Sequence, residues 1–270
     1  MHSSLDAAPD PADPAVGALL ADITEEAARL ILPLWRSGMA VDAKADKSPV
    51  TEADRRAETL ILMRLARWFP DIPVISEEDA SEFGTPETIA ARFFLVDPLD
   101  GTKAFVRGDP NFTVNIGLIQ GGRAVAGAVT APPSGETWFT GPLPGGDRGA
   151  FKRRMGERHT APVGVRAWPS GEALALISHT MKPETIQLLA EEYGFSRTDP
   201  MDSSIKLCRI AEGNADIYPR HGPTMEWDTA AGQAVLEAAG GRVTTPEGEA
   251  FVYGKAADGF RNGHFVARGG

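Results

Sequence analysis

No segment constrains the fold of this chain more than residues 97–102, which read Asp-Pro-Leu-Asp-Gly-Thr. The preceding residues 92–96 are apolar and β-prone, which predicts a buried strand. Pro98 lacks the N–H that an interior strand needs and Gly101 permits a sharp turn, so we expect the chain to leave the sheet at Asp97. Two carboxylates and a hydroxyl at such a bend suit a divalent cation such as Mg²⁺, although a plain Asp/Gly turn has the same composition.

Composition describes an ordinary globular protein, long enough for one large domain or two modest ones: 270 residues, of which 42% are apolar and 24% charged. Acidic residues outnumber basic ones by 37 to 27, which argues against nucleic acid as a partner. A phosphate ligand would therefore need metal ions or local lysine and arginine side chains to reverse the field. Cys208 is the single cysteine, so an intrachain disulfide and a cysteine-based zinc cluster are excluded.

The N-terminal segment gives no sign of export. Residues 1–14 are rich in Asp, Pro and Ala, which predicts a disordered leader and lacks the pattern of a signal peptide. No apolar run approaches the length needed to span a membrane. We therefore expect a soluble cytoplasmic protein; the sequence sets no oligomeric state.

The apolar pattern predicts an α+β chain in two halves, residues 15–150 and 151–268, with the boundary in a loop-rich stretch at 132–166. In the first half we expect helices at 16–35 and 51–68, and strands at 73–76, 92–97, 112–119 and 123–131. In the second half we expect strands at 173–178, 215–218, 242–244 and 264–266, and helices at 183–193, 204–212 and 228–239. This mixture of hairpins and helices favours stacked layers over a regular βαβ series.

Four acidic residues stand at the ends of predicted strands or at a predicted helix start: Glu77, Asp97, Asp100 and Asp228. Taken singly, each has a simpler explanation. Asp228 at a helix start is typical of a cap, and Glu77 belongs to an acidic run that is typical of a solvated loop.

Asp54 lies in the first turn of the helix expected after Thr51, where an acidic residue is expected merely to favour the helix dipole. If that helix packs beside residues 97–102, the Asp54 carboxylate would instead accept the proton of the Thr102 hydroxyl. Thr102 would then take a proton from a metal-bound water, which would complete a relay to a general base.

Taken together, two segments resemble the signatures of the Mg²⁺-dependent, lithium-sensitive phosphatases of the inositol monophosphatase superfamily. They are residues 97–102 and the pair Trp227-Asp228 followed by Gly240-Gly241. Further segments are similar to the CysQ-type 3′(2′),5′-bisphosphate nucleotidases of that superfamily: Lys47–Asp54, Ser76–Asp79, Phe112–Ile116 and Ser203–Thr224. The resemblance covers residues 16–267 apart from the loop near 140–165. Ala104 and Glu226 depart from the nucleotidase pattern.

This resemblance implies an α-β-α-β-α layered sandwich of the inositol monophosphatase / fructose-1,6-bisphosphatase type, with two or three Mg²⁺ ions between the halves. It assigns the first ion to Glu77, Asp97 and the Leu99 carbonyl, and the second to Asp97, Asp100 and Asp228. Asp54 and Thr102 would activate the attacking water. The implied substrate contacts are Glu77, Leu99, Asp100, Gly101, Thr102, His179, Ser203, Lys206, Arg220 and Asp228.

The function that the resemblance implies is hydrolysis of the 3′-phosphate of adenosine 3′,5′-bisphosphate to AMP and phosphate, a small-molecule reaction of sulfur metabolism. Two alternatives stay open at this point. One is a phosphatase of the same superfamily acting on inositol monophosphate, histidinol phosphate or fructose bisphosphate, and the other is a catalytically silent regulator that binds Mg²⁺ or a nucleotide. Some relatives associate peripherally with the inner membrane, which qualifies the expected cytoplasmic location.

Overall fold

The computed structural model describes residues 10–37, 41–43 and 49–270. Most of the leader expected at residues 1–14, and Lys47 and Ser48 of the nucleotidase-like segment, lie outside these ranges. None of the helices in the described part of the chain combines the length and the apolarity that crossing a bilayer requires.

A large sheet dominates the N-terminal part of the molecule, and its seven strands follow one another in sequence order. β3 lies parallel to β4, and the later pairs are antiparallel. Its strands are β3 (Val74–Ser76), β4 (Arg92–Asp100), β5 (Thr113–Gln120), β6 (Arg123–Ala131), β7 (Glu136–Pro142), β8 (Arg148–Arg154) and β9 (Thr160–Val163).

A small sheet of five strands forms the C-terminal part, in the order β11-β10-β12-β16-β14. It mixes parallel and antiparallel pairs, because β10 is parallel to both β11 and β12 whereas β16 is antiparallel to its neighbours. Its strands are β10 (Leu174–Ile177), β11 (Arg197–Pro200), β12 (Ile217–Arg220), β14 (Arg242–Thr244) and β16 (Phe265–Arg268). Two short pairs complete the strands: β1 (Val41–Ala43) with β2 (Pro49–Thr51), and β13 (Thr224–Met225) with β15 (Arg261–Asn262).

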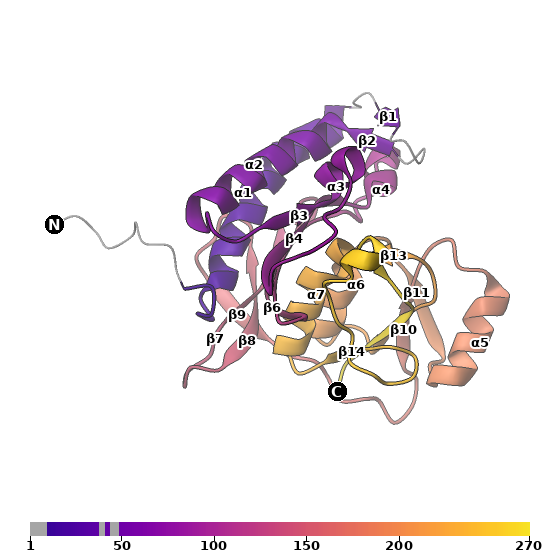
Figure 1. Cartoon of the computed structure of the whole chain (residues 1–270). Helices are drawn as coiled ribbons and strands as arrows, with labels where there is room; N and C mark the ends of the chain where they lie inside the picture. The colour runs from indigo at the N-terminus through magenta and orange to yellow at the C-terminus, as the bar shows by residue number, and fades with distance from the viewer. Residues whose placement is uncertain (1–9, 38–40, 44–48) are drawn as a thin grey trace.

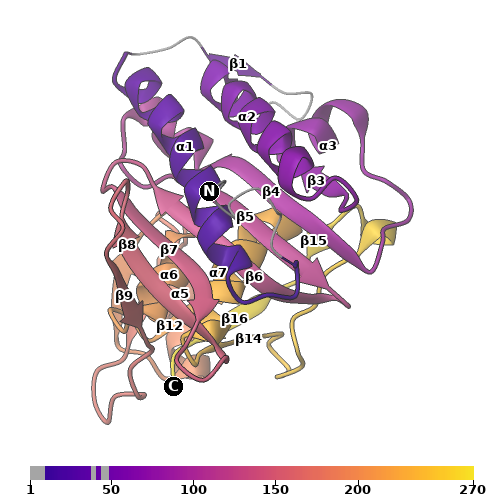
Figure 2. The same ribbon diagram turned by 90° about the vertical axis from the view of Figure 1, so that its left-hand side faces the viewer.

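The helices separate and cover the two sheets, so the molecule is a layered α-β-α-β-α sandwich (Figure 1). Figure 2 shows α1 and α2 lying across one face of the large sheet. α6 and α7 lie between the two sheets, and α5 covers the far face of the small sheet. The helices are α1 (Val16–Ser37), α2 (Glu52–Trp68), α3 (Glu77–Phe83), α4 (Thr102–Arg107), α5 (Pro183–Tyr193), α6 (Ile205–Ala211), α7 (Glu226–Ala238) and the 3₁₀ turn η1 (Ala256–Asp258).

Strand alternation explains why both faces of the large sheet are covered. In β4, Phe94 and Val96 pack into the core beneath α1 and α2, whereas Phe93 and Leu95 point to the opposite core around α7. A strand whose side chains are apolar on both faces must be buried on both faces, because successive side chains point to opposite sides of a sheet. The buried strand that the sequence pattern at 92–96 predicts is thus observed.

α7 approaches the large sheet very closely because glycine stands where the two meet. A Cβ atom on Gly127 of β6 would lie 2.6 Å from the carbonyl oxygen of Ala231, and one on Gly117 of β5 would lie 2.8 Å from the Cβ of Ala230. Such distances are too short for non-bonded carbon atoms. The Ala-rich face of α7 therefore rests directly on the sheet backbone, which sets the position of Asp228 in its first turn.

Two expectations from the sequence were wrong. The chain does not leave the sheet at Asp97, because β4 continues through Pro98 to Asp100 with a register shift between Asp97 and Asp100. Pro98 is tolerated at this irregularity, where the ladder is interrupted. The stretch 132–166 is not mainly loop either, since it holds β7, β8 and β9, and the large sheet extends to Val163, beyond the division expected at residue 150.

Candidate active site

The irregular end of β4 delivers Asp97 and Asp100 to the space between the two sheets. Asp97 is 1% exposed, and its Oδ1 accepts a hydrogen bond from the backbone N–H of Leu99 at 3.0 Å. Gly101 follows with φ +96°, and a Cβ there would lie 2.9 Å from the carbonyl oxygen of Asn111. Only glycine accepts this left-handed turn without strain, so Gly101 allows α4 to start directly after Asp100.

α7 supplies a further carboxylate from the other part of the chain. Asp228 is the third residue of α7, and its Oδ2 accepts a hydrogen bond from the backbone N–H of Met225 at 2.8 Å. This is the capping contact that an acidic residue at a helix start favours. The cap fixes one oxygen of Asp228 and leaves the other for a different contact.

The acidic side chains share one electrostatic environment. Burial raises the pKa of Asp97 well above its ordinary value, and the charges of Glu77, Asp100 and Asp228 raise it further. Burial likewise raises the pKa of Asp228 well above its ordinary value, and the charges of Asp100 and Glu77 add to the effect. The pKa of Asp100 is raised by burial too, although the charge of Lys206 opposes the shift. These carboxylates repel one another, which a bound cation would reverse.

The described residues fit Mg²⁺ by their chemistry, since the candidate ligands are carboxylate and carbonyl oxygens. In the part of the chain that the structure describes, however, no group of three or more His, Cys, Asp and Glu side chains is arranged so that it could hold a metal ion as it stands. Ligation would therefore require side chains to turn towards a common point. The assignment of Glu77, Asp97, Leu99, Asp100 and Asp228 as ligands stays a prediction.

The structure brings Asp54 and Thr102 together from separate segments. The hydroxyl of Thr102 lies 3.2 Å from Asp54 Oδ1, to which it donates, and 3.2 Å from the Leu99 carbonyl oxygen. The other carboxylate oxygen of Asp54 accepts the Thr51 backbone N–H at 2.8 Å and the Thr51 hydroxyl at 2.5 Å. Asp54 is 1% exposed, so this carboxylate is held in one orientation with Oδ1 aimed at Thr102.

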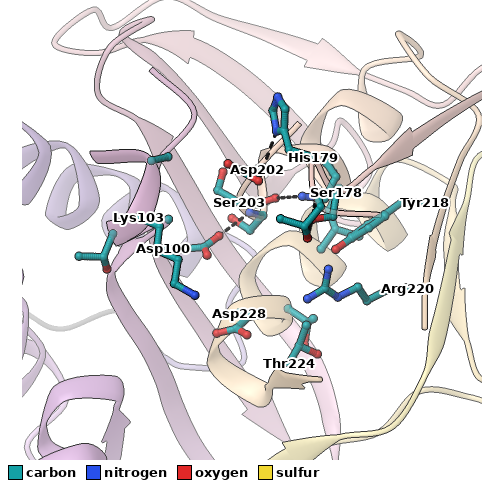
Figure 3. A pocket seen from close by; sticks show the side chains of 18 of the residues that line it. Asp100, Lys103, Ser178, His179, Asp202, Ser203, Tyr218, Arg220, Thr224 and Asp228 are labelled. Carbon is teal, nitrogen blue, oxygen red and sulfur yellow. Dashed lines mark hydrogen bonds and ion pairs between the residues drawn. The ribbon is translucent and has the colours of Figure 1, made fainter. Parts of the chain in front are cut away.

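One cavity of about 600 Å³ joins these groups to the C-terminal part of the chain. Figure 3 shows the Asp100 and Asp228 carboxylates on one side of it and Arg220, which reaches towards them, on the other. The cavity is lined by most of the residues expected from the sequence: Glu77, Asp100, Gly101, Thr102, His179, Ser203, Lys206, Arg220 and Asp228. Asp54, Asp97 and Leu99 are not part of the lining and lie behind it.

Lys206 is not a freely extended phosphate-binding side chain in this structure. It is 3% exposed, and its Nζ donates to the carbonyl oxygens of Met201 at 3.0 Å and Ser203 at 2.7 Å. Burial lowers the pKa of Lys206 to about 8, although Asp100 opposes that shift. Lys206 therefore shapes the turn before α6 and places a positive charge near Asp100.

The guanidinium of Arg220 carries an N–H donor that a ligand could use. Its Nη2 donates to the Pro223 carbonyl oxygen at 3.1 Å, while its buried Nε has no hydrogen-bond partner among the described residues. A buried donor without a partner costs free energy, and a hydrogen bond from Nε to a phosphate oxygen would remove that cost. His179 lies at the exposed rim, with its Nδ1 3.4 Å from Asp202.

Sequence reasoning missed the residues that tie the site together across its two parts. Ser204 donates its backbone N–H to Asp100, and Asp202 pairs with Arg107 at 2.9 Å and with His179. Thr113 contacts both Asp100 and Ser204. Signals did exist, because Thr113 and Ser204 each belong to a segment that resembles the nucleotidases, but nothing in the sequence shows that the two segments meet.

A sequence model described as the Inositol monophosphatase family matches residues 16–262, which is most of the chain. The chain belongs to this family. Among its relatives, the 3′(2′),5′-bisphosphate nucleotidase CysQ of Salmonella typhimurium is 40% identical over 210 residues, which cover 78% of this chain and 81% of that protein. The CysQ protein of Escherichia coli K12 is 40% identical over 215 residues, covering 80% and 83% respectively.

Solved structures of the family share the fold. The crystal structure of CysQ from Bacteroides thetaiotaomicron has a TM-score of 0.72 and 32% identity, and the match covers 93% of this chain and 96% of that one. The extragenic suppressor protein suhB from Bartonella henselae has a TM-score of 0.72 at 24% identity, with 93% of each chain covered, and shows the fold alone. The family and the layered fold expected from the sequence are thus confirmed.

Proposed function

We propose that this inositol monophosphatase family member is a Mg²⁺-dependent phosphatase that hydrolyses the 3′-phosphate of adenosine 3′,5′-bisphosphate to AMP and phosphate. The observation that carries the proposal is a cavity in which carboxylates from β4 and α7 lie opposite Arg220, with Lys206 also in its lining. The choice of substrate rests on the relatives, since those at 40% identity bear the name 3′(2′),5′-bisphosphate nucleotidase.

The acidic side of the cavity supports the cation requirement. When bound by Glu77, Asp97, Asp100 and Asp228, Mg²⁺ would offset their mutual repulsion, lower the pKa of the attacking water and neutralise the phosphate oxygens. The net charge of −10 makes such neutralisation necessary, because an anionic substrate would otherwise be repelled.

Thr102 in the cavity wall and Asp54 behind it support a proton relay. Thr102 donates to Asp54, so the lone pairs of its hydroxyl oxygen are available to accept a hydrogen bond from a water in the cavity. As that water attacks phosphorus, its proton passes to Thr102 and the Thr102 proton passes to Asp54. The bond between phosphorus and the 3′ oxygen breaks as the new bond forms, and the departing 3′ oxygen takes a proton from a solvent water in the cavity, which gives the 3′ hydroxyl of AMP. Thr51 holds Asp54 in the orientation that this transfer needs.

The cationic side supports recognition of a second phosphate. Arg220 offers its buried, unpartnered Nε to an anion, and Lys206 adds a fixed positive charge at the turn that carries Ser203. A substrate with a single phosphate would occupy either the acidic side of the cavity or the cationic side, and the other side would have no phosphate to bind. The geometry therefore favours a bisphosphate over inositol monophosphate or histidinol phosphate.

A phosphate-release assay with matched substrates tests the proposal. Adenosine 3′,5′-bisphosphate should be hydrolysed with a higher kcat/KM than inositol 1-phosphate or histidinol phosphate, and EDTA should abolish release until Mg²⁺ is restored. Preference for a monophosphate would contradict the substrate assignment. Absence of release from every substrate in Mg²⁺ would support a silent binding protein instead.

Asp100→Asn gives a sharper test of the acidic group. We expect phosphate release to fall by at least about 100-fold, because the variant removes one charge from the candidate cation site. Its melting temperature without Mg²⁺ should rise, since one of several mutually repelling buried carboxylates is lost. Normal turnover of this variant in Mg²⁺ would show that Asp100 is not a ligand.

A further inference from the structure

A buried polar network that the proposed mechanism does not use surrounds one oxygen of Asp100. Its Oδ2 accepts a hydrogen bond from the backbone N–H of Ser204 and lies 3.4 Å from the hydroxyl of Thr113. Thr113 is the first residue of β5, and Ser204 immediately precedes α6. The network therefore joins the large sheet to the C-terminal part of the chain at a candidate metal ligand.

The hydroxyl groups close this network. Ser204 Oγ donates to Asn115 Oδ1 at 2.8 Å and lies 2.9 Å from Thr113 Oγ1. Because the Ser204 proton is used on Asn115, the single Thr113 proton is shared between Ser204 Oγ and the longer contact to Asp100. Thr113, Asn115 and Ser204 are 0%, 1% and 5% exposed. Water therefore does not compete for these hydrogen bonds, and each constrains the others.

The turn at residues 201–204 is held in a conformation that it would not adopt alone. Ser203 has φ +60°, in the left-handed region, which is unfavourable for a residue other than glycine. Two sets of hydrogen bonds hold Ser203 in this conformation. Lys206 Nζ donates to the carbonyl oxygens of Met201 and Ser203, and the Ser204 hydroxyl donates to Asn115 of β5. Strain of this kind persists only where the surroundings impose it, and it is concentrated at functional sites.

We propose that Thr113 and Ser204 are positioning residues, which hold the Asp100 carboxylate at a fixed place against the turn that carries Ser203. The inference rests on the proposed function of the cavity, since it assigns these residues to the geometry of that site. This positioning makes the cation side and the nucleotide side of the cavity interdependent, because the Asp100 carboxylate belongs to the candidate cation site and also accepts the N–H of Ser204 in the turn that carries Ser203. We therefore expect a change that loosens this contact to weaken the affinity for both Mg²⁺ and the nucleotide.

Two isosteric variants separate positioning from ordinary structural loss. Thr113→Val removes the contacts to Asp100 and Ser204, whereas Thr130→Val on β6 removes buried contacts to Thr24 at 2.8 Å and Thr137 at 3.1 Å. Thr113 and Thr130 are both 0% exposed. We expect similar losses of unfolding free energy in urea, so stability alone will not distinguish the variants.

The Mg²⁺ dependence of the melting temperature is the readout that distinguishes them, and it requires no turnover. Thr113→Val should need about 10-fold more Mg²⁺ for the half-maximal shift, as is typical when a ligand loses its supporting hydrogen bond, and its KM should rise as well. Thr130→Val should keep the wild-type Mg²⁺ midpoint and KM. Equal behaviour of the two variants would overturn the inference.

Ser204→Ala provides an independent arm, because it removes the anchor to Asn115 and Thr113 but keeps the backbone N–H that faces Asp100. It should raise the Mg²⁺ midpoint and KM, and the double variant with Thr113→Val should lose less than the sum of the two single effects. Additive effects would contradict a shared network.

If the wild-type chain neither releases phosphate nor responds to Mg²⁺, the proposed function fails. If the wild-type chain does both and Thr113→Val behaves like Thr130→Val, only this inference fails.

Discussion

The hydroxyl of Thr102 is the residue-scale feature on which the proposed chemistry depends. It donates to Asp54 Oδ1, which two contacts from Thr51 hold in place. Thr102→Ala should lower kcat by about 100-fold, because the attacking water loses its proton acceptor. The Mg²⁺ midpoint of the melting temperature should change much less than kcat, because Thr102 is not assigned as a ligand and, among the assigned ligands, contacts only the Leu99 carbonyl oxygen, which the backbone of β4 holds in place.

Thr59→Ala is the matched control for this variant. Thr59 is an exposed residue of α2 whose hydroxyl only donates to the Arg55 carbonyl oxygen at 2.9 Å. Steady-state kinetics should show an unchanged kcat for Thr59→Ala. A Thr102→Ala enzyme with wild-type kcat would rule out the relay.

Asp216 predicts a pH dependence of stability that is separate from the cavity. Burial raises its pKa, but hydrogen bonds from the Arg166 guanidinium and the Leu174 N–H outweigh burial, so the pKa lies below the ordinary value. A lowered pKa contributes stability above the unfolded value of about 3.9, and the contribution disappears as the pH falls through the folded value.

Asp216→Asn should therefore lower the free energy of unfolding by about 2 kcal/mol at pH 7, measured in urea. The difference from wild type should shrink as the pH is lowered below about 4, where the carboxylate of the wild type becomes protonated. A difference that does not depend on pH would mean that the ion pair with Arg166 contributes nothing.

At the scale of elements, α2 supports the cavity with two carboxylates one turn apart. Asp54 faces Thr102, and Glu58 accepts the Ser76 hydroxyl and the backbone N–H groups of Glu78 and Asp79, at 3.1 and 3.2 Å for the last two. Ser76, the N-cap residue of α3, makes no capping hydrogen bond of its own, so Glu58 caps that helix from α2. Glu77 is the first residue of the capped helix.

Glu58→Ala should lower stability by about 1 kcal/mol, as loss of a helix cap does, and should raise the Mg²⁺ midpoint because Glu77 loses its support. Glu58→Gln is the matched variant, since it keeps an acceptor oxygen of the same reach, and it should retain most of the Mg²⁺ response. Both quantities come from thermal denaturation with increasing Mg²⁺. An alanine variant with an unchanged midpoint would show that the cap does not position Glu77.

The elements that could be predicted from sequence are those with a strong local pattern. The long apolar periodicity of α1 and the hairpin of β5 and β6 were predicted nearly to the residue, because their patterns repeat over many positions. β7, β8 and β9 were missed, since Pro, Gly and basic residues interrupt their patterns. The continuation of β4 past Pro98 was missed as well, because the irregularity that tolerates proline depends on how β5 pairs with it.

At the scale of the whole molecule, α6 and α7 form the layer between the two sheets, and the core on that side of the large sheet depends on the position of α7. Gly127→Ala should lower the free energy of unfolding by about 1–3 kcal/mol, because its Cβ would meet the Ala231 carbonyl oxygen at 2.6 Å. It should also raise the Mg²⁺ midpoint, because a displaced α7 carries Asp228 away from Asp100.

Gly171→Ala is the control, since Gly171 has open space around the place of a Cβ atom. It should leave urea unfolding and the Mg²⁺ midpoint close to those of the wild type. If Gly127→Ala matched this control in both measurements, the close approach of α7 to β6 would not determine the position of Asp228.

The sequence by itself determined the family, the layered α+β class and the set of acidic residues, because each is carried by a short motif or by a local apolar period. Only the tertiary structure decided that Asp54 meets Thr102, that Lys206 shapes a turn, and that Ser204 binds Asp100. The first and the last of these contacts join residues 48 and 104 positions apart in the chain, and their geometry depends on how the layers pack, whereas the Lys206 contacts are local in sequence. Spacing along a sequence carries no information on that packing, because it depends on side chains from every layer at once.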